Sequence, residues 1–293
     1  MIVPNIHLNE TLSIKPEYQN NSGVSGNKFR KLKYNLEAVN FLKTKTILTF
    51  GGAFSNHIAA VAQAGKEAGI NTIGIIRGEE LAERIHDNPT LKTAQDNGMH
   101  LKFVSRSQYR DKESPTFLDA LTTEFRSYYY LPEGGTNALA VKGCEEILGE
   151  EDKEFDIICC PVGTGGTLAG LINSSSPHQK ILGFSALKGD FLNDDISKFA
   201  KKDNWNLITD YHFGGYAKIN HELISFINRF KLRFDILLDP VYTGKMMFGI
   251  FDMLKKGRLS GNEKILAIHT GGLQGIAGMN LKLKQRELPI IKI

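Results

Sequence analysis

Short apolar runs alternate with glycine-rich turns and small-residue helical segments along this chain. Residues 46–50 (TILTF) predict a strand, 51–57 (GGAFSNH) predict a turn, and 58–69 (IAAVAQAGKEAG) predict an alanine-rich helix that stops at a glycine. The next apolar run, 71–78, predicts another strand. A strand, a helix and a second strand in this order form a βαβ unit, which favours a parallel sheet with helical crossovers.

The same order of elements recurs in the second half of the chain, so we predict an α/β fold. We expect strands at 155–162 (FDIICCPV), 180–186 (KILGFSA) and 263–270 (EKILAIHT). Glycine-rich turns follow the first and last of these strands, at 163–167 (GTGGT) and 271–275 (GGLQG). Such turns lie at the carboxyl edge of a parallel sheet, where open α/β folds bind ligands. Together with the glycine turn of the first βαβ unit, they are expected to line one cleft.

Residues 234–257 (FDILLDPVYTGKMMFGIFDMLKKG) combine a strand-like start with an amphipathic helix that ends in two lysines and a glycine stop. Tyr242 and Thr243 lie where the strand would give way to the helix, and Tyr216 follows a glycine pair in HFGGYAK. Each tyrosine taken alone is more typical of packing than of chemistry.

Composition excludes several classes of protein. The 293 residues are 41% hydrophobic and 23% charged, with a net charge of +4 that is spread along the chain, so no nucleic-acid partner is expected. No apolar run approaches the roughly 18 residues that a membrane helix needs, and the N-terminus does not resemble a secretory signal. We therefore expect a cytoplasmic protein without a membrane partner. Cys144, Cys159 and Cys160 are expected to be buried thiols rather than a disulfide framework.

The turn after the 155–162 strand has the composition of an anion site. Its glycines allow a tight turn with exposed N–H groups, its threonines add hydroxyls, and the following helix directs its positive end at the turn. The residues concerned are Gly163, Thr164, Gly165, Gly166 and Thr167. The turn has neither the Gly-Lys-Ser/Thr of a Walker loop nor dinucleotide spacing, so a single phosphate fits best. The alternative is a glycine-rich helix start with no ligand.

The turn at 51–57 begins another helix, with Ser55, Asn56 and His57 at its start. These neutral donors suit a carboxylate held against the helix dipole. Ordinary capping by Ser55 or Asn56 is the alternative, and the turn alone favours it. His57 taken singly is more typical of a structural residue.

The segment SGNKFRKLK contains four cations, of which Lys28 is the first. A lysine forms a Schiff base when burial or neighbouring cations depress its pKa, and Arg30, Lys31 and Lys33 lie close in sequence. The alternative is a solvated cationic face.

Five segments in order resemble one family, the D-cysteine desulfhydrase and 1-aminocyclopropane-1-carboxylate deaminase group of fold type II pyridoxal-phosphate enzymes. The resemblance covers residues from about 15 to 280 and rests on SGNKFRKLKYNL, GGAFSNHIAAVA, PVGTGGTLAGL, DPVYTGKMMFGI and HTGG. It implies pyridoxal 5'-phosphate as the cofactor and a small amino acid as the substrate.

The resemblance also implies roles for individual residues. Lys28 matches the lysine that forms the Schiff base with the cofactor, and Lys31 would lie near the cofactor phosphate. Asn56 would hold the ring hydroxyl of the cofactor, while Ser55 and His57 would receive the substrate carboxylate.

The remaining matches complete the implied site. The 163–167 turn would hold the phosphate, and Tyr242 and Tyr216 match two active-site tyrosines. The implied catalytic residues are thus Lys28, Ser55, Tyr216 and Tyr242. Arg30 and Lys33 have no implied role and are interpreted as cations at a helix start.

One position divides the family. The deaminase branch resembles Tyr-Glu-Gly-Lys, in which the glutamate meets the pyridine nitrogen, whereas this chain has Thr243. It also has Thr270, which in the desulfhydrase branch faces that nitrogen. Both threonines are therefore implied as cofactor-binding. A hydroxyl leaves the pyridine closer to neutral than a carboxylate does, which suffices when a β-leaving group drains the developing carbanion.

We therefore expect a lyase that converts D-cysteine to pyruvate, ammonia and sulfide by α,β-elimination, and we also admit the hydrolase class. The freed Lys28 or a nearby tyrosine would take the α-proton. The alternatives are ring opening of 1-aminocyclopropane-1-carboxylate to 2-oxobutanoate and ammonia, or a non-catalytic protein that binds a phosphate-bearing ligand.

The resemblance implies two domains, each an open, mostly parallel, twisted sheet flanked by helices, with the active-site cleft between them. We expect a large pyridoxal-phosphate-binding domain formed by residues 1–34 and 141–293, and a small α/β domain formed by 35–140. The family is usually dimeric, so a homodimer is expected. No metal is expected.

Overall fold

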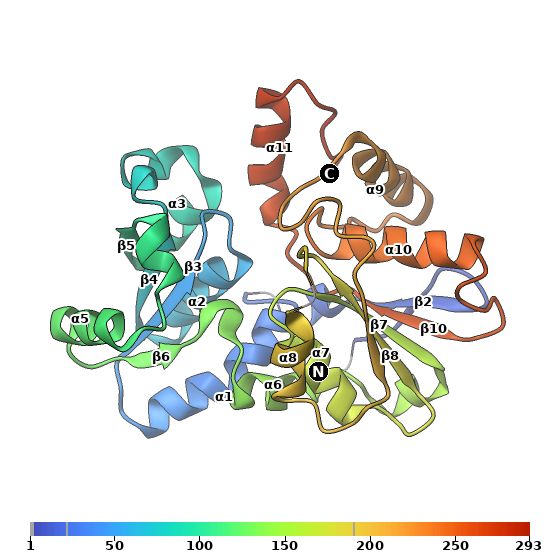
Figure 1. The fold of residues 1–293 in the computed structure, drawn as a ribbon, viewed down its shortest axis with the longest axis horizontal. Coiled ribbons are helices and arrows are strands. Elements are labelled where there is room, and N and C mark those ends of the chain that lie inside the picture. The colour runs from blue at the N-terminus through green and yellow to red at the C-terminus, as the bar shows by residue number, and fades with distance from the viewer. Residues whose placement is uncertain (1–2, 22, 190) are drawn as a thin grey trace. The chain divides into compact units, whose positions relative to one another are not determined.

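The computed structural model describes residues 3–21, 23–189 and 191–293, and the chain forms two compact units (Figure 1). The larger unit combines the residues up to Lys31 with Ala138–Ile293, and the smaller consists of Leu32–Asn137. The boundaries expected from the sequence, after residues 34 and 140, lie slightly later in the chain. Each unit has its own sheet, and the predicted α/β class is confirmed. The cleft expected between the domains stays a prediction.

The larger unit is built on a six-stranded sheet. From one edge to the other its strands are β1 (Ile6–His7), β2 (Leu12–Lys15), β10 (Ile265–Ile268), β7 (Ile157–Val162), β8 (Lys180–Ser185) and β9 (Trp205–Ile208). Only the β1–β2 pair is antiparallel among the described strands. Parallel pairing requires crossover connections, and helices supply them.

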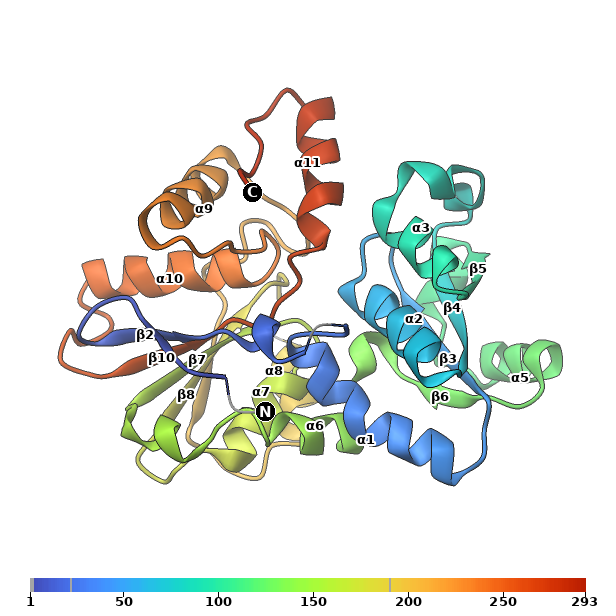
Figure 2. The same cartoon turned by 180° about the vertical axis from the view of Figure 1, so that it is seen from behind.

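Helices cover both faces of this sheet, as two opposite views show (Figures 1 and 2). On one face lie α9 (His221–Phe234), α10 (Thr243–Lys255) and α11 (Gly275–Gln285), and on the other lie α6 (Ala138–Cys144), α7 (Gly166–Ser174) and α8 (Leu192–Ser197).

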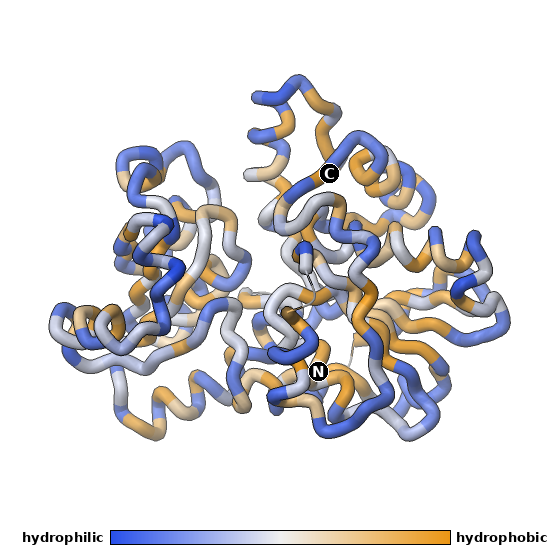
Figure 3. Tube along the Cα trace, in the orientation of Figure 1, coloured by the Kyte–Doolittle hydropathy of each residue, from blue (hydrophilic) through white to orange (hydrophobic). Residues whose placement is uncertain are grey.

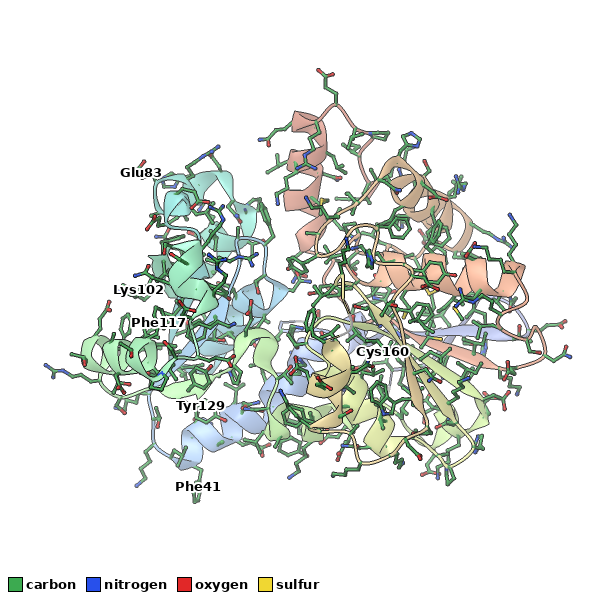
Figure 4. All side chains as sticks on the ribbon, in the orientation of Figure 1. Phe41, Glu83, Lys102, Phe117, Tyr129 and Cys160 are labelled. Atoms are coloured by element: carbon green, nitrogen blue, oxygen red, sulfur yellow. The ribbon has the colours of Figure 1, made fainter. Side chains whose placement is uncertain are left out.

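Successive side chains of the central strands enter opposite cores. In β7, Ile157 and Cys159 pack on the side of α10, whereas Ile158 and Cys160 pack on the side of α7. This alternation explains why β7 and β10 are mostly apolar along their length (Figure 3), since both of their faces are buried. Cys160 (Figure 4), Cys144 and Cys159 are buried free thiols, as expected.

The smaller unit has a four-stranded, fully parallel sheet. Its order is β5 (His100–Val104), β4 (Asn71–Arg77), β3 (Thr46–Gly51) and β6 (Tyr129–Leu131). The accompanying helices are α2 (Asn56–Ala68), α3 (Pro89–Asp96), α4 (Arg106–Arg110) and α5 (Pro115–Phe125), and α1 (Asn27–Phe41) begins in the larger unit and continues into the smaller. Short 3-10 helices form at Glu17–Gln19, Glu79–Asp87, Glu133–Gly135 and Glu150–Glu154.

The predicted strands are confirmed as β3, β4, β7, β8 and β10. The predicted helix after the first glycine turn is α2, which ends at Gly69 in the left-handed conformation, as its glycine stop indicated.

One predicted strand is wrong. The helical half of the 234–257 segment is α10, but Ile236 and Leu238 do not belong to a strand. They are buried in the core beside α9 and α10. His269, which follows β10, bonds through Nε2 to the carbonyl of Leu237, but β10 already pairs with β2 and β7 and has no free edge for a further strand. An apolar run alone does not distinguish a strand from a buried irregular segment.

Within the ranges that the structure describes, no helix combines the length and the apolar character needed to cross a membrane.

Candidate functional site

Two of the three glycine-rich turns lie at one sheet edge. The strands β7 and β10 are parallel neighbours, so the turns that follow them, at 163–167 and 270–275, leave the larger sheet at the same edge. The third turn, at 51–57, follows β3 in the smaller sheet. From the sequence, all three turns were expected to line one cleft. In the structure they belong to two different sheets.

The start of α1 is fixed against both turns of the larger sheet. Gly26 has a φ of 70°, and a Cβ added to it would overlap the carbonyl oxygen of Thr270. The backbone N–H of Asn27 donates to that same oxygen at 3.1 Å. The side-chain Nδ2 of Asn27 donates to Oγ1 of Thr167 at 2.8 Å. The first turn of α1, which carries Lys28, is therefore held between the two glycine turns.

Lys28 is half-buried, and its Nζ donates to Oδ1 of Asn27 at 3.3 Å. Burial, and second to it the positive charge of Lys31, lower the pKa of Lys28 from the usual 10.5 to about 7. Near neutral pH a large share of this amine is therefore unprotonated, which is the form that attacks a carbonyl.

Lys31 and the start of α7 form a place for an anion. Lys31 is buried, its Nζ donates to Oγ1 of Thr164 at 3.3 Å, and burial lowers its pKa. The N-cap of α7 is Gly165, at a φ of 80°, and no side-chain cap is made there within the described residues. The first turn, including Gly166 and Thr167, is buried. Unsatisfied N–H groups at a buried helix start suit an anion.

The interpretation of Arg30 as a solvent-facing cation was wrong. Arg30 is buried and donates from Nε and Nη2 to the carboxylate of Glu17, at 2.9 and 3.1 Å. Glu17 is fully buried, so this bidentate pair fixes the segment before α1 rather than binding a ligand. Lys33 is half-buried, with its Nζ 4.8 Å from the ring centre of Tyr34.

Tyr242 and Tyr216 lie together, and Tyr242 contacts the glycine turn at 163–167. A Cβ on Gly163 would lie 3.0 Å from Cε1 of Tyr242, so a larger residue there would crowd this ring. The ring centres of Tyr216 and Tyr242 are 6.2 Å apart with their planes at 62°. Tyr216 is 40% exposed. The two tyrosines, which are 26 positions apart in sequence, therefore form one edge-to-face pair.

Thr243 is fully buried, and its hydroxyl donates to Oδ2 of Asp239 at 2.7 Å. The carboxylate of Asp239 also accepts the backbone N–H groups of Val241, Tyr242 and Thr243. Asp239 therefore caps the start of α10, and the hydroxyl of Thr243 is engaged in that cap.

Thr270 differs from Thr243 in the hydrogen bonding of its side-chain hydroxyl. Its backbone oxygen holds the start of α1, while its hydroxyl makes no hydrogen bond within the described part of the chain. The residue is only 7% exposed. A nearly buried hydroxyl without a protein partner is suited to a ligand, because burying it unpaired is unfavourable.

In the smaller unit, Ser55 caps α2 by accepting the N–H of Ile58 at 3.3 Å, as the capping alternative held. Asn56 is the first residue of that helix. These residues also stand where the first-turn N–H groups of α2 lack intrahelical acceptors.

His57 is 3% exposed, and its Nε2 lies 2.7 Å from Oγ1 of Thr49. Because the Thr49 hydroxyl donates to the carbonyl of Leu131, it accepts from His57, so Nε2 carries the proton. A Cβ on Gly135 would lie 2.9 Å from Cε1 of this ring. The imidazole is thus part of the core of the smaller unit, and any carboxylate contact would come from the backbone N–H.

Sequence reasoning missed the supporting residues. Asn27 bonds to the site residues Lys28 and Thr167, and Asp239 bonds to Tyr242 and Thr243. Glu17 pairs with Arg30 and fixes the segment before α1. Asp239 precedes the N-cap of α10, which is Tyr242, so it does not stand at the position where a cap signal is read from sequence. Glu17 had no such signal, because its partner is distant in sequence.

Comparison with known proteins bears on these features. The family described as pyridoxal-phosphate dependent enzyme matches residues 3–271. A protein of Pyrococcus horikoshii, provisionally named a 1-aminocyclopropane-1-carboxylate deaminase, is 31% identical over 93% of this chain and 88% of the relative.

Two further comparisons agree. The bifunctional D-cysteine desulfhydrase/1-aminocyclopropane-1-carboxylate deaminase of Arabidopsis thaliana, a mitochondrial protein, is 29% identical over 86% of this chain and 70% of the relative. A crystal structure described as that of an ACC deaminase homologue has a TM-score of 0.82 and 29% identity, and it covers 96% of both chains.

Proposed function

We propose that this chain, which belongs to the family of pyridoxal-phosphate-dependent enzymes, catalyses α,β-elimination on a small D-amino acid. The leading substrate is D-cysteine, which with water gives pyruvate, ammonia and sulfide. The chain is an enzyme of the 1-aminocyclopropane-1-carboxylate deaminase/D-cysteine desulfhydrase type, so the non-catalytic alternative is wrong. The expectation that also admitted a hydrolase was too broad, since the relatives support a lyase.

The residues of the larger unit fit the cofactor. The cofactor phosphate would be held by the uncapped start of α7 and by Lys31, which lies beside Thr164. Its aldehyde would meet Lys28, whose pKa of about 7 provides a neutral amine. Thr270 would offer its unpaired hydroxyl to the pyridine ring. From the smaller unit, the resemblance implies that Asn56 would hold the ring hydroxyl.

The single observation that favours elimination is the absence of a carboxylate at two key positions. Thr243, where the deaminase pattern has glutamate, is engaged with Asp239, and Thr270 carries a hydroxyl. The cofactor supplies an electron sink for charge developing at Cα, and that sink is weaker when a hydroxyl rather than a carboxylate faces the ring nitrogen. A substrate with a β-leaving group tolerates the weaker sink.

This chain's own groups would perform the remaining tasks. The N–H groups at the start of α2, with Ser55 and His57, would orient the substrate carboxylate. Lys28, once free, would accept the α-proton at Nζ, since its lowered pKa lets it act as a base at neutral pH. Tyr242 and Tyr216, whose rings form an edge-to-face pair, would hold or relay a proton from the substrate.

Ring opening of 1-aminocyclopropane-1-carboxylate is the second candidate, because the names of several relatives include that activity. The two functions release different keto acids, pyruvate and 2-oxobutanoate, and this separates them.

The test supplies the cofactor-loaded enzyme with D-cysteine, L-cysteine and 1-aminocyclopropane-1-carboxylate in parallel, and identifies the keto acid released from each. We expect pyruvate and sulfide from D-cysteine at a kcat/KM at least about tenfold above that for either competitor. Preferred release of 2-oxobutanoate would establish the second candidate instead. The variant Lys28→Ala is the matched control for non-enzymatic release.

A further inference from the structure

Lys245 is a buried lysine whose ammonium group contacts only backbone carbonyls among the described residues. It lies in α10 and is 2% exposed. Its Nζ donates to the carbonyl oxygens of His212 and Gly215, at 2.9 and 2.8 Å. Burial lowers its pKa to about 8. Burying an ammonium group is costly, so these two bonds are expected to serve a purpose beyond packing.

The two carbonyls belong to a loop with an unusual backbone. Phe213, Gly214, Gly215 and Ala217 have positive φ values of 54°, 94°, 114° and 54°. Left-handed conformations at non-glycine residues are unfavourable and persist only when their surroundings enforce them. The carbonyls of His212 and Gly215 already accept the N–H groups of Gly215 and Lys218 within the loop. The ammonium group therefore uses their second acceptor sites.

The same loop carries Tyr216, and α10 contacts it at three places. The Tyr216 ring meets Tyr242 at the start of α10, Lys245 binds the two carbonyls one turn later, and Phe213 meets Phe248 with ring centres 5.0 Å apart. The middle contact is the polar one. It holds the peptide carbonyl directly before Tyr216, that of Gly215, and the carbonyl of His212 at the start of the loop.

We propose that Lys245 is a positioning residue, which holds the 212–217 loop on α10 so that Tyr216 stays against Tyr242. The role in catalysis rests on the proposed function, because it assumes that this tyrosine pair faces the substrate. The positioning itself is a property of the larger unit alone.

The first experiment measures the loop directly. Hydrogen–deuterium exchange of residues 212–218 is compared in wild type, Lys245→Met and Lys255→Met, where Lys255 is an exposed lysine of the same helix. We expect exchange of the Gly214, Gly215 and Lys218 amides to rise at least about tenfold in Lys245→Met only, because their hydrogen bonds depend on the held loop. Unchanged exchange would overturn the proposal.

The second experiment is a double-mutant cycle on the elimination reaction. Lys245→Met is expected to lower kcat/KM about 10–100-fold in wild type but less than about twofold in the Tyr216→Phe background. An equal loss in both backgrounds would show that Lys245 does not act through Tyr216 and would overturn the proposal. The variant Lys245→Gln keeps amide donors and replaces Lys245→Met if the latter does not fold.

The two experiments separate the two proposals. Faster loop exchange in Lys245→Met, in a wild type that eliminates no D-amino acid, would support the positioning role and refute the proposed function. Elimination activity that is unaffected by Lys245→Met would support the function and refute the positioning role.

Discussion

The role proposed for Lys28 depends on its surroundings, because burial and the charge of Lys31 lower the pKa of its amine to about 7. The sequence offered four cations in one segment, and only the resemblance to a family selected this one. The structure adds an independent reason, since Lys28 has a pKa lowered to about 7 at the point where two glycine turns meet. Arg30 was misjudged because its burial depends on Glu17, whose pairing no local pattern predicts.

Stability should depend on pH through Lys28 in the cofactor-free protein. Its pKa is about 7 when folded and 10.5 when unfolded, so between these values the unfolded chain binds the extra proton and stability rises with pH. The free energy of unfolding of Lys28→Met should therefore exceed that of wild type at pH 6. The difference between the two should be smaller at pH 9. Urea unfolding at both values tests this, with Lys255→Met as the control. A gap that stays constant would show that the amine is not buried as described.

Lys31 should contribute to phosphate affinity. Its buried ammonium beside Thr164 adds a charge-assisted hydrogen bond, worth about 1.5–3 kcal/mol. Lys31→Met should weaken pyridoxal phosphate binding at least about tenfold, whereas Lys33→Met, two positions along, should change it less than about twofold. Absorbance titration of the cofactor-free proteins measures both, and equal affinities would remove Lys31 from the phosphate site.

At the scale of elements, the strands β3, β4, β7, β8 and β10 were predictable, because apolar runs next to turn residues mark them. The strands β2, β5, β6 and β9 had no such signal and were not predicted. The irregular segment at 236–238 was not predictable either, since burial without pairing leaves the same apolar pattern as a strand. The pairing of Tyr216 with Tyr242 was also beyond the sequence, because it depends on the loop that Lys245 holds.

The contact between the start of α1 and the turn after β10 should be sensitive to a single methyl group. Gly26→Ala would place a Cβ against the carbonyl of Thr270, in addition to the cost of its positive φ. Gly69→Ala is the matched control, since Gly69 has a φ of 66° and nothing within 4 Å of an added Cβ. Each variant should lose about 1 kcal/mol of unfolding free energy because alanine is unfavourable at a positive φ. Gly26→Ala should lose about 1–3 kcal/mol more because its Cβ clashes with the Thr270 carbonyl. Urea denaturation midpoints compare them, and equal losses would contradict the close contact.

At the scale of the whole molecule, cofactor binding should stabilise some segments more than others. The proposed phosphate and amine contacts all lie in the larger unit, at 26–31, 163–168 and 270–272. Ligand binding slows the opening of the segments it holds, so hydrogen exchange there should slow on addition of pyridoxal phosphate. The edge strand β9 serves as an internal control and should change little. Uniform slowing throughout the chain would argue against this placement.

The two-unit architecture and the cofactor could be predicted only from several motifs that occur in the same order as in one family. No single turn was enough to predict either. How the functional side chains are supported, by Asn27, Asp239 and Lys245, required the structure. Supporting residues of this kind come from different elements, and their sequence positions share no periodicity.

The central claim is that Lys28 is the amine around which the site is built. The most direct test loads the enzyme with pyridoxal phosphate, reduces it with borohydride, and maps the labelled peptide by mass spectrometry, with Lys28→Ala treated in parallel. We expect the label on the peptide containing Lys28 in wild type and no comparable label in the variant. Stoichiometric label on any other lysine, in either protein, would contradict the account.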